Sequence, residues 1–226
     1  MSATKYSLLT DELLSVRDMA GELHRATLPE VLARLVEDDL ASFEALQAHQ
    51  KQPWYSFLTQ LGAMAVARHN DGELPTSASR WRELLLGLAD GEEAVWSLVV
   101  EDVSKPAFLQ PPVPEGSLEE AGFSLDIETP DDLDVLVTSK NHDIKMHRIR
   151  QPAVEHWVYA LVTLQTMEGF LGRGNYGISR MNGGFGNRPL LGVTPDLSWG
   201  TRFKRDVAVL VDGRAERIDE RFTEDG

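Results

Sequence analysis

Apolar side chains recur at helical spacing in four stretches of the chain. The first helix is predicted to begin at Thr27, which can act as the cap, with Pro29 in the first turn. The same period predicts helices over 54–68, 79–88 and 152–168. The stripe of the first helix consists of Val31, Leu32, Leu35 and Val36. We expect the aromatic side chains of helices 54–68 and 79–88 to lie in the core.

Short apolar runs between these helices predict strands. They cover 6–10 and 13–16 around an acidic turn, 95–100, 190–193 and 207–211. Four prolines between Lys105 and Pro114 exclude a helix or a central strand, so we expect an extended segment on the surface. Helices and strands mixed in this way predict an α+β fold. It would be a mixed globular domain with several helices, short strands, and long glycine-rich and basic loops.

Composition narrows the class of protein. The chain has 226 residues, of which 42% are hydrophobic and 26% charged, as in ordinary globular domains. We expect one domain over 1–226, or alternatively an acidic helical part (1–135) and a part with basic loops (136–226). Cysteine is absent, which excludes disulfides and catalytic thiols. The first 20 residues lack the apolar run of a signal peptide, and we expect a cytoplasmic protein.

Charge is distributed unevenly along the chain. The formal net charge is −14, which argues against a nucleic-acid binder. Residues 140–205, however, hold 10 basic and 4 acidic side chains, whereas residues 1–139 hold 9 basic and 25 acidic ones. Either the basic side chains cluster by chance, or this block faces a polyanion.

Motifs for catalysis are weak. Gly172–Gly177 matches the G-x-G-x-x-G expression, but a helix precedes it and more glycine follows, whereas a dinucleotide site needs a strand before and a helix after. The residues around His142 and His147 have the composition of a nuclease or metal site. Aspartate, histidine and lysine in a polar loop are more often simply solvated. We therefore predict no enzyme, no catalytic residue, no metal and no cofactor.

Binding is the chemistry that remains. Eight of the 18 glycines fall between Gly169 and Gly192, and glycines allow backbone N–H groups to approach a ligand closely. Asn175 and Asn182 can donate to and accept from base edges. A helix over 152–168 would separate this loop from the basic loop 138–151 by about 25 Å at most, so both could flank one duplex. The alternative is two surface loops whose glycines only permit turns, and the residues alone do not decide.

Four segments, taken in order, resemble the large subunit of the type I-E CRISPR surveillance complex Cascade (the CasA family). The opening 8–17 is similar to the family's start, and Lys105–Gln110 resembles its P-F-hydrophobic-Q segment. Residues 139–145 fall where the family has a mobile loop, and 169–192 where it has a glycine loop. Each segment is weak evidence alone, and the ordered set is specific.

The resemblance implies a non-catalytic subunit of an antiviral ribonucleoprotein. Such a subunit recognises the flanking motif (PAM) of double-stranded target DNA, promotes R-loop formation and recruits a helicase-nuclease, while guide RNA and other Cascade subunits are its partners. Family members are commonly longer, so we expect their C-terminal helical bundle to be absent here. The DNA-binding residues predicted from loops and resemblance together are Gly172, Arg173, Gly174, Asn175, Asn182, Lys140, Asn141, Lys145, Met146, His147, Arg148 and Arg150. A glycine-loop nucleotide-binding enzyme and a pure protein scaffold are the competing hypotheses.

Overall fold

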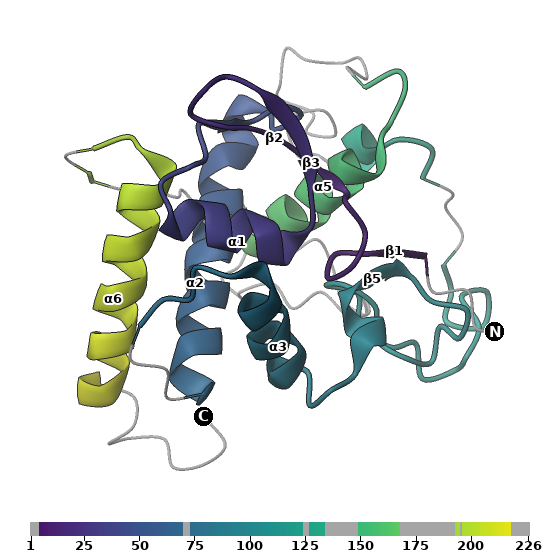
Figure 1. Ribbon diagram of the computed structural model, residues 1–226. Coiled ribbons are helices and arrows are strands. Elements are labelled where there is room, and N and C mark those ends of the chain that lie inside the picture. Colours follow the sequence, from purple (N-terminus) through teal and green to yellow (C-terminus); the bar gives the residue numbers. More distant parts are fainter. Residues whose placement is uncertain are drawn as a thin grey trace. The chain divides into compact units, whose positions relative to one another are not determined.

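The computed structural model describes residues 5–69, 73–123, 127–133, 149–167, 193–194 and 196–217. These residues form five α-helices, five short β-strands and three 3₁₀ helices (Figure 1). The strands pair antiparallel in two small sheets. The fold is therefore of the mixed α+β class, as the sequence predicts.

The chain divides into two compact units, and each unit is assembled from three separate segments. Unit 1 consists of Met1–Leu13, Ala45–Trp54 and Glu93–Leu191. Unit 2 consists of Leu14–Glu44, Tyr55–Glu92 and Gly192–Gly226. These interleaved boundaries differ from both divisions predicted from the sequence.

A three-stranded sheet in the order β3-β2-β4 forms part of unit 2. The central strand β2 (Leu14–Arg17) pairs with β3 (Leu23–Ala26) on one side and with β4 (Ser42–Phe43) on the other. Leu14 and Val16 of β2 are fully buried, which agrees with the strand predicted over 13–16. Strands β3 and β4 were not predicted. In β3 only the last residue is buried, so its apolar pattern is too weak to mark a strand.

Helix α1 (Leu28–Val36) begins at the predicted cap. The Oγ1 atom of Thr27 accepts a hydrogen bond from the backbone N–H of Glu30 (3.3 Å), and Oε2 of Glu30 accepts one from the backbone N–H of Thr27 (2.7 Å). This reciprocal pair is a capping box, which satisfies two amides that a helix start leaves open. Three of the four predicted stripe residues are buried: Val31, Leu32 and Leu35.

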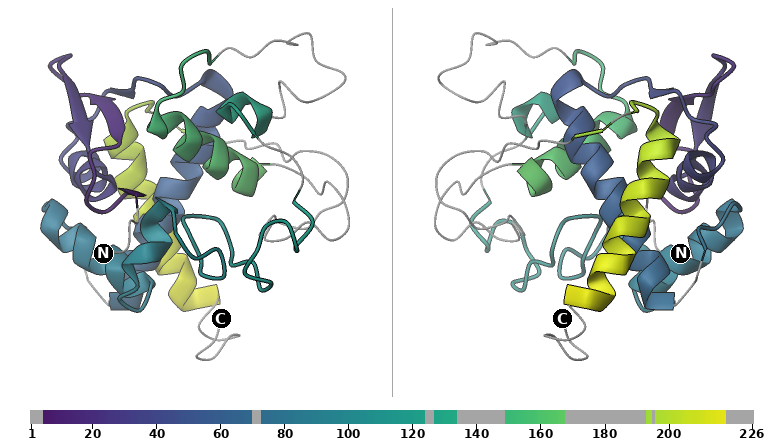
Figure 2. Two further views of the ribbon diagram at one scale, coloured as in Figure 1. Left: turned by 90° about the vertical axis from the view of Figure 1, so that its right-hand side faces the viewer. Right: turned by 90° about the vertical axis from the view of Figure 1, so that its left-hand side faces the viewer.

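Three longer helices complete unit 2. Helix α2 (Lys51–His69) follows the 3₁₀ helix η1 (Ala48–Gln50), and its residues from Tyr55 onward belong to this unit. Helices α3 (Ala78–Leu88) and α6 (Trp199–Arg217) follow. Figure 2 shows α6 running beside α2. A Cβ atom at Gly62 of α2 would lie 2.9 Å from the ring of Phe203 on α6, so glycine permits this close packing.

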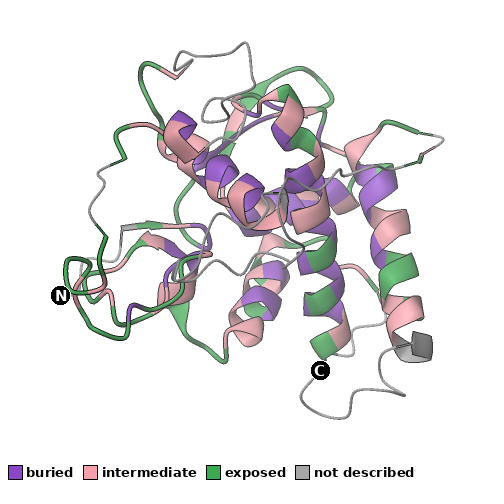
Figure 3. Ribbon diagram, turned by 180° about the vertical axis from the view of Figure 1, so that it is seen from behind, coloured by how far each residue is buried: buried purple, intermediate pink, exposed green. Residues whose placement is uncertain are grey.

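The strand predicted over 207–211 is wrong, because these residues lie within α6. Phe203 and Val207, four residues apart, are buried on one side of the helix. Val209 and Leu210 are 64% and 42% exposed, and Figure 3 shows exposed positions along this half of α6. A five-residue apolar run has no period of its own, so helix and strand cannot be distinguished from it. Of the strand predicted over 190–193, only Val193 is described, and it lies outside regular structure.

In unit 1, β1 (Lys5–Ser7) pairs antiparallel with β5 (Ser97–Val99), which the 3₁₀ helix η2 (Glu93–Trp96) precedes. Both strands are shorter than the predicted runs. The segment after β5 forms neither a helix nor a named strand, as its prolines require. However, Phe108 is only 3% exposed and its backbone N–H donates to the carbonyl oxygen of Ser97 (2.8 Å). Ala107 and Val113 are buried as well, so the prediction that this segment lies on the surface is wrong at these three residues.

The remaining elements of unit 1 are the 3₁₀ helix η3 (Pro130–Leu133) and helix α5 (Val154–Met167). Helix α5 confirms the helix predicted over 152–168. Its Tyr159 meets Trp54 edge to face, with ring centroids 5.0 Å apart, and both side chains are buried. Trp54, Tyr55 and Trp81 are buried, which confirms the core prediction for these aromatic residues of helices 54–68 and 79–88, whereas Phe57 is only partly buried.

Candidate nucleic-acid interface

Of the twelve predicted DNA-binding residues, the structure describes Arg150 alone. Arg150 is exposed and lies in a bend shortly before α5. The others lie outside the described residues: Gly172, Arg173, Gly174, Asn175, Asn182, Lys140, Asn141, Lys145, Met146, His147 and Arg148. What the structure defines is the framework that precedes and follows these segments in unit 1.

The described residues on either side of 134–148 are joined by a buried carboxylate. Oδ2 of Asp131, in η3, accepts a hydrogen bond from the backbone N–H of Ile149 (2.8 Å), and Asp131 is only 1% exposed. A buried carboxylate is retained where it satisfies backbone donors. The described residues that flank 134–148 in the sequence therefore lie close together in unit 1. Asp131 was not predicted as a functional residue, because nothing in the sequence distinguishes it from the other acidic residues nearby.

Helix α5 lies between the two predicted loops in the sequence. Its 14 residues span about 20 Å at 1.5 Å per residue. The helix is fixed in unit 1 by buried Val158 and Val162 and by Gln165, whose Nε2 donates to the carbonyl oxygen of Leu109 (3.0 Å). Residues 138–148 and 168–192 lie outside the described residues, so the expected upper limit of about 25 Å between the two loops stays a prediction.

Part of the predicted basic block is engaged inside unit 2. The ammonium group of Lys204 forms an ion pair with the carboxylate of Asp38. Nε of Arg205 donates to Oδ1 of Asp206 (2.6 Å), and its guanidinium also donates to Thr194 (3.2 Å). In the sequence, both cations fall within the basic block 140–205. In the fold, each of them pairs with an aspartate that lies outside this range. They add little to a surface that would attract a polyanion.

A third cation of the block, Arg202, packs within unit 2 against Tyr55. Its guanidinium carbon lies 4.0 Å from the centroid of the Tyr55 ring, and the residue is 9% exposed. The hydroxyl of Tyr55 donates to Oδ2 of Asp206 (2.5 Å). Burial, together with this hydrogen bond, raises the pKa of Tyr55 to about 12. Burial also works to raise the pKa of Asp206, but hydrogen bonds from Arg205 and Tyr55 outweigh it and hold that pKa below its ordinary value.

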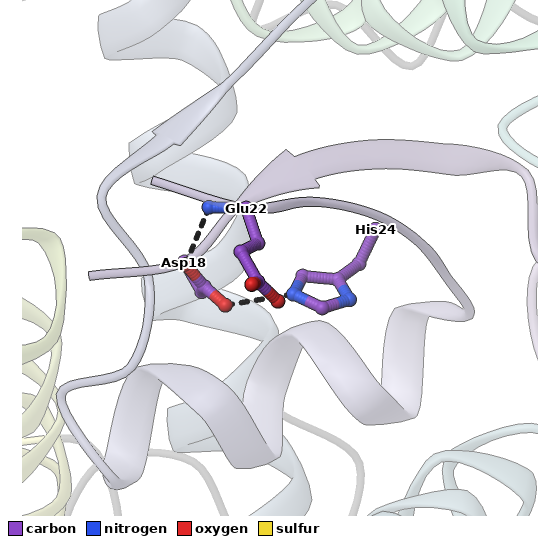
Figure 4. A group of neighbouring side chains, drawn as sticks. All are labelled: Asp18, Glu22 and His24. Atoms are coloured by element: carbon purple, nitrogen blue, oxygen red, sulfur yellow. Dashed lines mark hydrogen bonds and ion pairs between the residues drawn. The ribbon is translucent and has the colours of Figure 1, made fainter. Parts of the chain in front are cut away.

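One group of side chains in the described residues has the composition of a metal site. Asp18, Glu22 and His24 lie at the turn between β2 and β3, with potential ligand atoms within 4.8 Å of one another (Figure 4). The Asp18 carboxylate, however, accepts hydrogen bonds from the backbone N–H of Glu22 (2.8 Å) and pairs with Nε2 of His24 (2.7 Å). These bonds hold the pKa of Asp18 below its ordinary value. The two interactions of Asp18 brace the turn between β2 and β3, and this structural role explains why the three side chains lie together. The spacing of Asp18, Glu22 and His24 along the sequence is the signal from which this group could have been found.

Comparison of the chain with protein-family models, with curated proteins and with solved structures finds no match. Among the described residues, no helix is both long and apolar enough to cross a membrane. Membership of the CasA family therefore stays a prediction that depends on the four sequence segments.

Proposed function

We propose that this chain is the DNA-recognition subunit of a type I-E, RNA-guided surveillance complex. In that role it works in the cytoplasm, without catalysis of its own. It recognises the motif flanking a double-stranded DNA target and promotes R-loop formation. Its partners are the guide RNA, the other subunits of the complex and a helicase-nuclease that arrives after target binding.

The observation that carries this proposal is the order of four family-like segments along the chain. They begin in the opening 8–17 and continue through 105–110 and 139–145 to the glycine-rich stretch 169–192. No single segment is specific, but the set covers most of the chain in the order of the family.

The framework of unit 1 is compatible with this role. The described residues around three of these segments are linked by hydrogen bonds: Asp131 to Ile149, Gln165 to Leu109, and Phe108 to Ser97 of β5. These bonds give the segments a common support. A rigid support is what loops need if they are to read a duplex in a fixed register.

The proposed division of labour follows from chemistry. Lys140, Lys145, Arg148 and Arg150 would hold phosphates, which supplies affinity without sequence preference. The glycines and asparagines of 172–182 would approach the minor groove, where close backbone contact replaces long side chains. Because the chain carries a net charge of −14, its own affinity for DNA should be micromolar or weaker and should fall with salt.

Three variants test this division in the assembled, guide-loaded complex. The double substitution Lys145→Ala, Arg148→Ala should weaken binding equally for all flanking motifs. Asn175→Ala should change the preference among motifs. Lys204→Ala is the matched control, since this cation belongs to the same block but is paired with Asp38, and we expect binding to stay unchanged.

Two results would contradict the proposal. If Asn175→Ala weakened binding to every motif alike, the glycine-rich stretch would not read sequence. If Lys204→Ala reduced DNA binding as strongly as the double substitution did, the basic loop would have no special role. In both cases a scaffold function would explain the chain better.

A further inference from the structure

Two adjoining hollows flank strand β5 in unit 1. The larger has a volume of about 530 Å³ and is lined in part by Tyr6, Ile127 and Trp157. The smaller has a volume of about 220 Å³ and is lined in part by Val113 and Leu118. Leu98, Val99 and Gln110 line both. We call these two hollows together the β5 groove.

The β5 groove is rich in apolar side chains that are only half covered. Tyr6, Val99, Ile127 and Leu118 are between 42% and 49% exposed. Exposed apolar residues scattered singly over a surface need no explanation, but a group that lines one hollow is typical of a binding site. Burying these side chains under a partner would remove apolar surface from water.

The walls of the groove are held by backbone hydrogen bonds. Strand β5 pairs with β1 on one side, and on the other the carbonyl oxygen of Ser97 accepts from Phe108. The side-chain Nε2 of Gln110 donates to the carbonyl oxygen of Leu98 (3.0 Å). These bonds fix strand β5 and Gln110, which border both hollows, so part of a partner's site is formed in advance.

The charge of the groove's surroundings identifies the kind of partner. The described residues of 99–128 carry six acidic side chains and one basic side chain, and all seven are exposed. Such a field repels nucleic acid and attracts a basic polypeptide. The acidic residues are Glu101, Asp102, Glu115, Glu119, Glu120 and Glu128, which lie within two residues of lining residues along the chain, and the basic one is Lys105, which lines the smaller hollow itself.

We propose that the β5 groove binds a segment of a protein partner in which apolar anchor side chains are flanked by lysine or arginine. The apolar anchors occupy the two hollows, and the basic residues pair with the exposed acidic side chains of 101–128. Arg150, the one predicted DNA-binding residue that the structure describes, does not line the groove. The proposal does not depend on the DNA-recognition role.

The test measures binding of labelled synthetic peptides to the purified full chain by fluorescence anisotropy. The first peptide has leucine and tryptophan at its centre and lysines on both sides. The second keeps the apolar centre but replaces the lysines with glutamates, and the third keeps the lysines but replaces the centre with serines. We expect the first peptide to bind at least tenfold more tightly than either of the others.

Substitutions on the chain locate the binding site. Ile127→Glu should weaken binding of the first peptide at least tenfold, because it places a charge in the larger hollow. Ile127 lies outside helices and strands, so the fold should tolerate the change. Val209→Glu is the matched control, because Val209 is an exposed apolar residue of unit 2. Substitution of Glu119 and Glu120 with lysine should weaken binding of the lysine-flanked peptide and restore binding of the glutamate-flanked one.

Several outcomes overturn the proposal. Equal binding of the serine-centred peptide would mean that charge alone attracts the partner. Equal effects of Ile127→Glu and Val209→Glu would place binding outside the groove. If the chain self-associates in sedimentation and Ile127→Glu alone makes it monomeric, the occupant is a second copy of this chain. Absence of binding by all three peptides also rejects the proposal.

Discussion

The hydroxyl of Tyr55 offers a direct test of the interior of unit 2. Tyr55→Phe removes the hydrogen bond to Asp206 and leaves the ring under Arg202 in place. A hydrogen bond to a charged group contributes about 1.5 kcal/mol at the lower end of its usual range. The lower end applies because Asp206 keeps its bond from Arg205. We therefore expect the free energy of unfolding to fall by about 1.5 kcal/mol near pH 8.

The same substitution should have a different effect in alkali. The pKa of Tyr55 is about 12 in the folded chain, and about 10 in the unfolded chain. Between these values the unfolded state loses a proton that the folded state keeps, so wild-type stability falls as the pH rises. The loss is about 1.4 kcal/mol per pH unit above 10. Because phenylalanine has no such proton, the difference between variant and wild type should approach zero near pH 11.

The assay is urea unfolding followed by tryptophan fluorescence at pH 8 and pH 11, since Trp199 lies 6.0 Å from the Tyr55 ring. Tyr6→Phe is the control, because Tyr6 is 42% exposed and the loss of its hydroxyl should change stability little at either pH. An unchanged difference between Tyr55→Phe and wild type at the two pH values would refute the reasoning. It would mean that folding does not protect the phenol.

Three further predictions concern unit 2 and can be checked by denaturant unfolding. Gly200→Ala should destabilise the fold by about 2 kcal/mol, because its Cβ atom would lie 2.5 Å from the carbonyl oxygen of Leu35. Gly213→Ala in the same helix meets open space and should stabilise the fold by about 1 kcal/mol. If Gly213→Ala were the more destabilising of the two, the packing at Gly200 would be refuted. Thr27→Ala removes half of the capping box and should cost about 1 kcal/mol, and no loss would mean the cap is unimportant. A carboxyl group whose pKa is lowered in the folded state stabilises the fold at higher pH and loses this contribution as the pH falls below about 4. Asp18→Asn removes the carboxyl group, so the variant should lack this contribution and the acid-induced loss of stability that goes with it. Parallel acid profiles of wild type and Asp18→Asn would contradict the brace.

The elements that could be predicted from the sequence are those with a signal in neighbouring residues, such as a helix cap followed by an apolar period. The capping signal at Thr27 and the apolar period that follows it lie within ten residues, so α1 can be located without tertiary information. The run 207–211 has no such local signal, and it lies within a 19-residue helix whose extent the five residues alone do not reveal. The division into two interleaved units depends on contacts between distant segments, which composition does not reveal.

The candidate site shows the same limit. The glycines, asparagines and cations of the candidate DNA-binding segments could be identified in the sequence. The residues that hold the neighbouring backbone in place could not. Asp131 looks like any surface acid in the sequence, and its burial and its bond to Ile149 emerge only from the fold. The partner of Lys204 is Asp38, which is remote along the chain, so a count over one block overstates the positive charge.

The central claim is that this chain reads the bases beside a DNA target. It is tested most directly by capture of duplexes with randomised flanking bases on the guide-loaded complex, assembled with and without the chain. We predict that particular flanks are enriched only when the chain is present, and that Asn175→Ala alters which flanks are enriched. If the complex without the chain enriched the same flanks, the chain would not be the motif reader and the account would be wrong.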